Sequence, residues 1–236
     1  MKSFSNTYIF VFSTIMVVIV AALLSTAAMV LQPLQERNIE IQKKRNILSS
    51  IRIENDAKNA EELYDKYISN SFVINAETEE QEPFNAFEIE MGLQMRKTLE
   101  QRSLPVFISF LDDGTKKYIV PVHGKGLWGP IYGFVALNDD FITLYGAIFN
   151  HDDETPGLGA EINTDWFGAQ FTGKKIFNNN MDFISIDLVK GGADPKSLNE
   201  VDAISGGTLT SDGLEKMLYD CLSSYQTYFK NQMNNN

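Results

Sequence analysis

Three hydroxyl side chains surround a pair of glycines in the stretch Asp202–Thr210, which reads DAISGGTLT. Glycines let the backbone bend and let a bulky group approach the main chain. The hydroxyls belong to Ser205, Thr208 and Thr210. A helix is expected directly after this stretch, and the N–H groups at its start suit a phosphate. These residue types indicate a site for a phosphorylated group beside an exposed threonine. The alternative is a plain Gly-Gly turn that leads into a capped helix.

The helix that would position this site is predicted by apolar spacing. Residues at intervals of three and four fall on one helix face, and here they are Leu214, Met217, Leu218, Cys221, Leu222, Tyr225 and Phe229. Asp212 is a suitable N-cap, and Glu215 three residues later completes the usual start signal. Because the single cysteine lies on the apolar face, we expect it in the core rather than as a reactive thiol.

Residues 1–35 are predicted to form an uncleaved membrane anchor. No charged residue occurs between Lys2 and Glu36, and the apolar run Tyr8–Leu31 contains neither Gly nor Pro. A spanning helix needs roughly 20 apolar residues. A cleaved signal peptide is the alternative, but its apolar region is usually only about 7–15 residues. The distribution of Lys and Arg does not decide the orientation, because a long domain can cross a membrane regardless of charge.

The remaining chain is predicted to be one α+β domain with a mostly antiparallel sheet flanked by helices. We expect a helical connector over 36–70, the domain over 71–230 and a disordered tail over 231–236. The Asp-Gly turn at 112–114 predicts a hairpin. A further helix is expected over 84–101. Strands are expected at 106–111, 117–121, 134–137, 143–149 and 183–189.

Composition excludes several classes of function. The formal net charge is −11, and the one basic block, at 43–45, lies beside the anchor. Nucleic-acid binding is therefore not expected. This block is either a solvated helix face or a contact with anionic lipid. With two histidines and one cysteine, no zinc or iron–sulfur site is predicted. The run His151–Glu154 contains groups for a metal site or an acid–base pair, but adjacent residues rarely converge on one ion, and no spacing supports the acid–base pair.

Two further glycine-rich blocks precede the hydroxyl motif. The first, Gly124–Phe134, reads GKGLWGPIYGF, and the second, Glu154–Ile162, reads ETPGLGAEI. The first block is either a hydrophobic turn or a wall for a flat ring system. Glu154 and Thr155 are either hydrogen-bonding groups near a ligand or a helix cap.

The hydroxyl motif resembles a flavinylation signature, Asp-x-x-(Ser/Thr)-Gly-Ala-(Thr/Ser). In proteins with this signature, a flavin transferase uses FAD to join FMN, through its phosphate, to the last hydroxyl. The match places the flavin on Thr208. The sequence departs from the signature at Gly207, where Ala is usual. The nearby Thr210 does not fall at the hydroxyl position of the signature.

Together, the three blocks resemble the NqrC family, the C subunits of the sodium-translocating NADH:quinone oxidoreductase. The resemblance implies an electron-relay subunit with one transmembrane helix and one FMN-binding domain, with no substrate pocket and no catalytic residue of its own. The implied partners are the other subunits of the complex, a flavin transferase and membrane lipid. The implied location is the bacterial inner membrane, with the domain in the periplasm. The implied cofactor-binding residues are Thr208, Ser205, Gly206, Gly207, Glu154, Thr155 and Leu158, with Leu127 and Trp128 as weaker candidates.

Two alternatives remain open from the sequence. The first is the G subunit of the Rnf-type ferredoxin:NAD oxidoreductase, which has the same motif and also carries FMN. The second is a membrane-tethered binding or scaffold domain with no cofactor.

Overall fold

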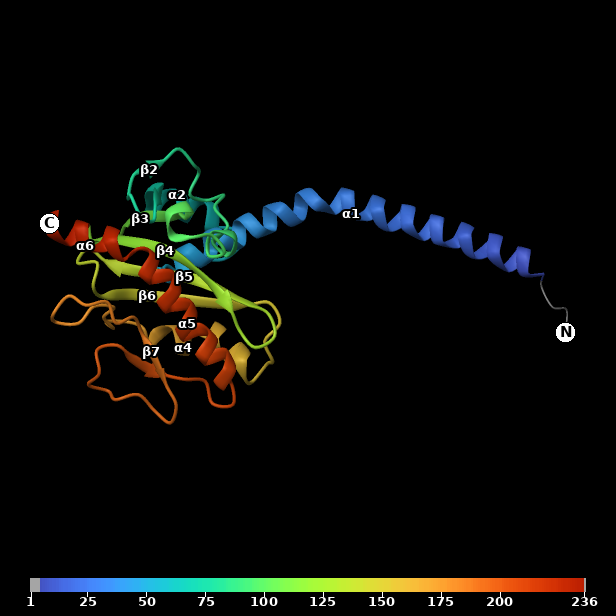
Figure 1. The fold of residues 1–236 in the computed structure, drawn as a ribbon. Coiled ribbons are helices and arrows are strands. Elements are labelled where there is room, and N and C mark those ends of the chain that lie inside the picture. The colour runs from blue at the N-terminus through green and yellow to red at the C-terminus, as the bar shows by residue number, and fades with distance from the viewer. Residues whose placement is uncertain (1–4, 236) are drawn as a thin grey trace. The chain divides into compact units, whose positions relative to one another are not determined.

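The computed structural model describes residues 5–235, and the chain divides into two units, the second beginning at Lys44 (Figure 1). The first unit consists of most of helix α1 (Asn6–Ser50), which continues through Pro33. Its most apolar window has a mean hydropathy of 2.6, and none of that window is buried. By length and composition, this helix is able to cross a membrane. The observation fits a membrane-anchored protein.

The second unit is built on a six-stranded sheet in the order β2-β1-β3-β4-β5-β6. All neighbouring strands in it are antiparallel. The predicted antiparallel sheet and the hairpin around residues 112–114 are therefore confirmed. The strands are β1 (Ile68–Asn75), β2 (Gln81–Glu82), β3 (Ser103–Phe110), β4 (Lys116–Lys125), β5 (Pro130–Asn138) and β6 (Leu144–His151).

Helices cover both faces of this sheet. Along β5, Val135 and Leu137 belong to one apolar cluster, while Phe134 and Ala136 belong to another, as expected when side chains alternate across a strand. The first cluster includes the predicted apolar face of α5 (Thr208–Ser224) and residues of α6 (Gln226–Asn235). The second includes the end of α1 and part of α2 (Ala60–Tyr67). Because both faces are buried, the central strands are apolar along almost their whole length.

A small parallel pair of strands leads into the hydroxyl motif. Strand β7 (Asp187–Val189) pairs with β8 (Glu200–Asp202), which ends at the first residue of the motif. Four short helical segments complete the unit: α3 (Met91–Gln94), η1 (Leu99–Gln101), η2 (Gly159–Asn163) and α4 (Asp165–Ala169).

Several expected boundaries differ from the structure. The helix predicted over 84–101 is wrong, because only α3 and η1 are helical there. The connector expected over 36–70 is interrupted after Ser50, and the compact unit begins at Lys44 rather than at residue 71. The strand expected over 183–189 is formed only by β7. Helix α6 runs through Asn235, over most of the range expected to be a disordered tail.

The predicted start of the last long helix is also wrong. Helix α5 begins at Thr208, and its N-cap is Gly207. Asp212 lies inside the helix and pairs with Lys190 at 3.1 Å. Glu215 accepts a hydrogen bond from the backbone of Leu188 at 2.7 Å, which leaves both acidic residues bound to the β7 segment instead of capping α5.

Candidate functional site

The hydroxyl motif forms the turn between β8 and α5, and its aspartate holds the turn in place. Asp202 accepts a hydrogen bond from the backbone N–H of Ala193 at 2.6 Å, and its own N–H donates to the side chain of Gln170 at 2.9 Å. Gly206 has φ +75°, a conformation that favours glycine. A Cβ at this position would lie 2.6 Å from the side chain of Leu158. The turn therefore requires glycine for both its backbone angle and its close packing.

Thr208 occupies the first position of α5, and its side chain is exposed. No side chain caps the helix at Gly207, and the first turn contains no acidic residue. The first N–H groups of a helix have no intrahelical acceptor. Together with the helix dipole, they attract an anion. The start of α5 is thus able to hold a phosphate next to the Thr208 hydroxyl.

Thr210 lies in a different environment from Thr208. It is only 1% exposed, and its hydroxyl donates a 2.5 Å hydrogen bond to Oε2 of Glu154. The other carboxylate oxygen, Oε1, accepts from the backbone N–H of Trp128 at 2.9 Å. Glu154 therefore links the start of α5 to the loop between β4 and β5. The Thr210 hydroxyl is therefore engaged and buried, whereas Thr208 is exposed.

The environment of Glu154 keeps its carboxylate ionised. Burial raises the pKa of this carboxyl, but hydrogen bonds from Thr210 and from the backbone N–H groups of Trp128, Gly129 and Leu127 outweigh burial, so the pKa lies below its ordinary value of 4.5. A carboxylate that accepts several N–H and O–H bonds orders the groups that donate them. Glu154 therefore fixes the shape of the loop beside Thr208.

This lowered pKa predicts a pH-dependent loss of stability. Because the folded-state pKa is depressed, the stabilisation is present above the unfolded-state pKa and is lost as the pH falls through the lower folded value. We expect Glu154→Gln to destabilise the domain by about 1.5–3 kcal/mol at neutral pH, the usual range for a hydrogen bond to a charged group. The difference in thermal midpoint from the wild type should shrink as the pH falls below 4.5.

The exposed Glu77 provides a control for this measurement. Glu77→Gln removes the same charge outside the Glu154 network, so it should leave the thermal midpoint almost unchanged at every pH. If the difference in thermal midpoint between Glu154→Gln and the wild type stays constant down to the lowest pH measured, the lowered pKa of Glu154 is contradicted.

A small cavity of about 270 Å³ lies beside the Thr208 hydroxyl. Leu127, Leu158 and Leu209 border it, and each is between 42% and 58% exposed. The volume is below the ~300–1,000 Å³ usual for small-molecule sites. This cavity is therefore large enough for only part of a flavin nucleotide, and the exposed leucines offer an apolar surface for a flat ring. The complete lining is Leu127, Glu154, Thr155, Leu158, Gly159, Gly206, Gly207, Thr208, Leu209 and Thr210.

Most residues predicted from the sequence meet at this cavity, and two do not. Ser205 is exposed outside the lining. Trp128 lines a neighbouring cavity instead, although its backbone contacts Glu154. Three lining residues, Gly159, Leu209 and Thr210, were not among the predicted cofactor-binding residues. The repeated glycines of the second block could have indicated Gly159, because its missing Cβ makes room for Glu154 and Thr210. No cluster of three metal-binding side chains occurs among residues 5–235.

Comparison with known proteins agrees with this geometry. The family model for the FMN-binding domain matches residues 126–223, a range that contains the whole lining of the cavity. The C subunit of the Na(+)-translocating NADH-quinone reductase of Vibrio vulnificus is 35% identical over 208 residues, which cover 82% of this chain and 81% of that protein. The corresponding protein of Haemophilus ducreyi is 29% identical, with coverage of 84% and 82%.

Two solved structures have the same fold. The C subunit of the Parabacteroides distasonis reductase aligns with a TM-score of 0.78 and 38% identity, covering 84% of this chain and 96% of that one. NqrC of Shewanella oneidensis aligns with a TM-score of 0.71 and 25% identity, covering 83% and 98%. The expected fold and FMN-binding domain are therefore confirmed, and the chain belongs to the NqrC family, the C subunits of Na+-translocating NADH-quinone reductases.

Proposed function

We propose that this chain is the electron-relay subunit of a Na+-translocating NADH-quinone reductase and carries FMN esterified through its phosphate to Thr208. The observation that carries this proposal is the exposed Thr208 hydroxyl at the uncapped start of α5. Thr210, the neighbouring hydroxyl, is engaged with Glu154. The NqrC relatives described above favour this function over that of the G subunit of the Rnf-type complex.

The residues around Thr208 have distinct roles in this proposal. The Thr208 oxygen forms the bond to phosphorus, and with FAD as the donor AMP leaves as that bond forms. The N–H groups of the first turn of α5 hold the negative charge of the phosphate. Leu127, Leu158 and Leu209 cover the ring and keep water from one side of it. Glu154 positions the loop that carries Leu127. When bound, FMN supplies the redox chemistry, and the protein supplies binding and orientation.

The proposed location follows from α1 and from the covalent bond. We place α1 across the bacterial inner membrane in contact with lipid, with the FMN-binding domain in the periplasm. A covalent ester prevents loss of FMN where no cytoplasmic pool replaces it. The proposed partners are the other subunits of the complex and the flavin transferase that completes the domain.

In-gel fluorescence tests this function directly. The full chain is produced with and without a flavin transferase, separated on a denaturing gel and viewed under ultraviolet light. We expect a fluorescent band only with the transferase, because only a covalently bound flavin survives denaturation. A chain that stays dark in both preparations would favour the scaffold hypothesis.

A further inference from the structure

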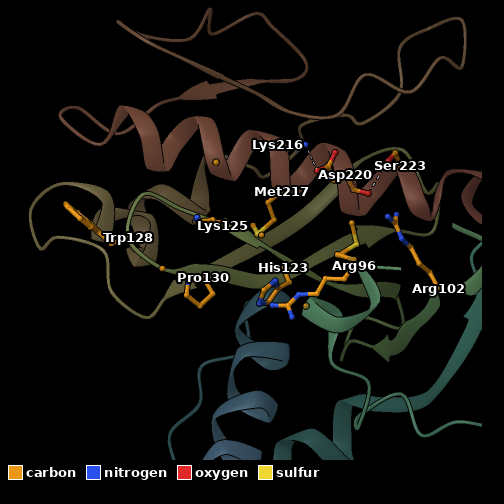
Figure 2. Close-up of a pocket in the computed structure, with 15 residues that line it drawn as sticks. Arg96, Arg102, His123, Lys125, Trp128, Pro130, Lys216, Met217, Asp220 and Ser223 are labelled. Carbon is orange, nitrogen blue, oxygen red and sulfur yellow. Dashed lines mark hydrogen bonds and ion pairs between the residues drawn. The ribbon is translucent and has the colours of Figure 1, made fainter. Parts of the chain in front are cut away.

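A second and larger cavity, of about 750 Å³, lies on the other side of the loop between β4 and β5. Three segments form its walls, namely residues 92–102, the paired ends of β4 and β5, and the middle of α5 (Figure 2). None of its lining residues borders the Thr208 cavity. Its volume is within the range usual for small-molecule sites. The two cavities are therefore separate sites that share one loop, with Leu127 facing one and Trp128 the other.

Positive charges gather in this cavity although the chain as a whole carries a net charge of −11. Four cations line it, Arg96, Arg102, Lys125 and Lys216, against one carboxylate, Asp220. Positive charges that line a concave surface raise the local concentration of anions. The lining thus has the opposite sign to the rest of the chain.

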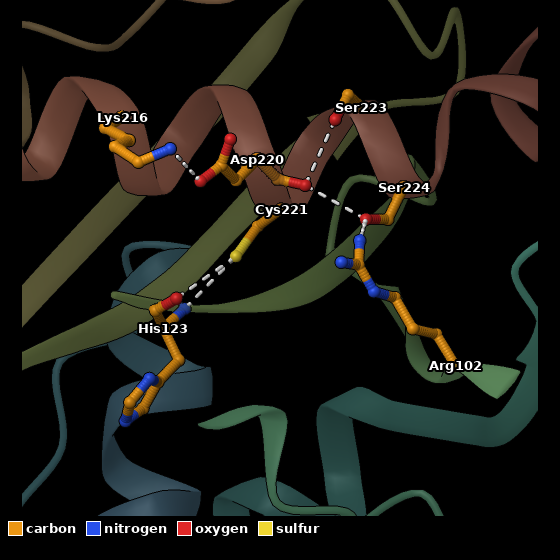
Figure 3. Close-up of polar contacts among 7 residues, drawn as sticks. All are labelled: Arg102, His123, Lys216, Asp220, Cys221, Ser223 and Ser224. Atoms are coloured by element: carbon orange, nitrogen blue, oxygen red, sulfur yellow. Dashed lines mark hydrogen bonds and ion pairs between the residues drawn. The ribbon is translucent and has the colours of Figure 1, made fainter. Parts of the chain in front are cut away.

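Two of these cations are already paired, and two are not. Lys216 lies 2.7 Å from Asp220, and Arg102 donates to the hydroxyl of Ser224 at 2.7 Å (Figure 3). Within residues 5–235, the side chains of Arg96 and Lys125 form neither a hydrogen bond nor an ion pair. Arg96 and Lys125 therefore retain their full capacity to bind an anion.

His123 lies next to Arg96 in the wall of the cavity (Figure 2). The backbone N–H and carbonyl of His123 are each 3.4 Å from Sγ of Cys221, which holds β4 against α5 (Figure 3). The imidazole packs on Gly92, where a Cβ would lie 2.9 Å from the ring. In the described part of the chain, neither ring nitrogen forms a hydrogen bond. This half-buried ring is therefore held in place with its polar atoms available to a ligand.

We propose that this cavity binds a small molecule that carries a phosphate or carboxylate group, with the oxyanion held between Arg96 and His123. The planar guanidinium of Arg96 matches such an oxyanion with two parallel N–H bonds. Lys125 adds a second free positive charge at the edge of the cavity. Trp128, Met95 and Met217 supply apolar surface for the remainder of the molecule. The inference is independent of the flavin assignment, because none of these residues lines the Thr208 cavity.

Anion binding at this cavity can be measured through the ring signals of the two histidines of the chain. Burial lowers the pKa of His123, the charge of Arg96 lowers it further, and Asp152 acts in the opposite direction. An anion bound between Arg96 and His123 offsets the charge of Arg96 and favours the imidazolium. Binding should therefore raise the pKa of His123. The ring signals of His151, which does not line this cavity, serve as an internal reference and should not respond to the anion.

The experiment uses the untagged full chain in detergent, with the ring signals of both histidines followed by NMR. Inorganic phosphate and succinate are titrated separately at constant ionic strength maintained with chloride. We expect a saturable shift of the His123 signal and a rise in its pKa, with no change at His151. Tighter binding of phosphate would identify a phosphate ester as the ligand class, and tighter binding of succinate a dicarboxylate.

Arg96→Gln should weaken this binding by about tenfold or more, because it removes the charged bidentate donor. Lys196→Gln is the matched control, since it removes an equal charge from an exposed position outside the cavity. An unchanged His151 signal in both variants verifies that the fold is intact. The proposal is overturned if neither anion gives a saturable shift of His123, or if Arg96→Gln and Lys196→Gln bind equally well.

Discussion

Thr208→Ala is expected to abolish covalent flavin without lowering the stability of the flavin-free protein. The hydroxyl of Thr208 is exposed at the first position of α5, and no hydrogen bond of this side chain is formed within the described residues. Its removal therefore costs the fold little, while the proposed bond to phosphorus loses its oxygen. In-gel fluorescence measures the flavin, and thermal unfolding without flavin measures the stability. Thr208→Ser is the control, because it keeps a hydroxyl and should remain fluorescent.

Thr210→Ala should show the opposite pattern. Its hydroxyl is 1% exposed and donates to the carboxylate of Glu154, so its loss leaves a buried charge with one donor fewer. We expect a loss of about 1.5–3 kcal/mol in the free energy of unfolding and a fluorescent band that persists. A band that survives in Thr208→Ala and disappears in Thr210→Ala would move the attachment site and contradict the proposal.

Gly159→Ala is expected to destabilise the domain strongly. A Cβ at this position would collide with both Oγ1 of Thr210 and Oε2 of Glu154. Overpacking and the loss of a charged hydrogen bond together give an expected cost of about 3 kcal/mol or more. The backbone N of Gly159 also lies close to Gly207, so a displacement should disturb the start of α5. Flavin attachment should therefore fall together with the midpoint of urea unfolding.

Gly157→Ala is the matched control for this prediction. Gly157 is two residues away and has φ +75°, but a Cβ there would meet open space. We expect only the backbone cost, about 1 kcal/mol, and normal flavin attachment. Equal destabilisation by the two substitutions would show that the packing around Glu154 and Thr210 does not control the site.

Local patterns predicted the parts of the fold that depend on periodicity. The apolar face of α5 was predicted correctly, because residues such as Leu214 and Leu218 are spaced at the helical period and are all buried. The hairpin of β3 and β4 followed from the Asp-Gly turn. Strand β1 was missed, because it is fixed by its pairing with β3, which is distant in sequence. The prediction of a helix over 84–101 was wrong, because the buried residues there, such as Met91, do not recur at the helical period.

The candidate site was predictable as a set of residues but not as an arrangement. The motif identified Thr208, and the second block identified Glu154. The sequence could not reveal that Glu154 binds Thr210 and the backbone of Trp128, because these contacts join three segments that are distant in sequence. The separation of Leu127 and Trp128 into different cavities depends on the same contacts. Asp212 was misassigned as a cap, since its actual partner is Lys190 near β7.

The most direct test of the flavin assignment is the mass of one tryptic peptide from the mature protein. Cleavage after Lys196 and Lys216 releases the peptide Ser197–Lys216, which contains Thr208 and Thr210. This peptide should be heavier by FMN less one water, and fragmentation should place the added mass on Thr208. An unmodified peptide from a mature complex, or added mass on Thr210 or Ser205, would contradict it.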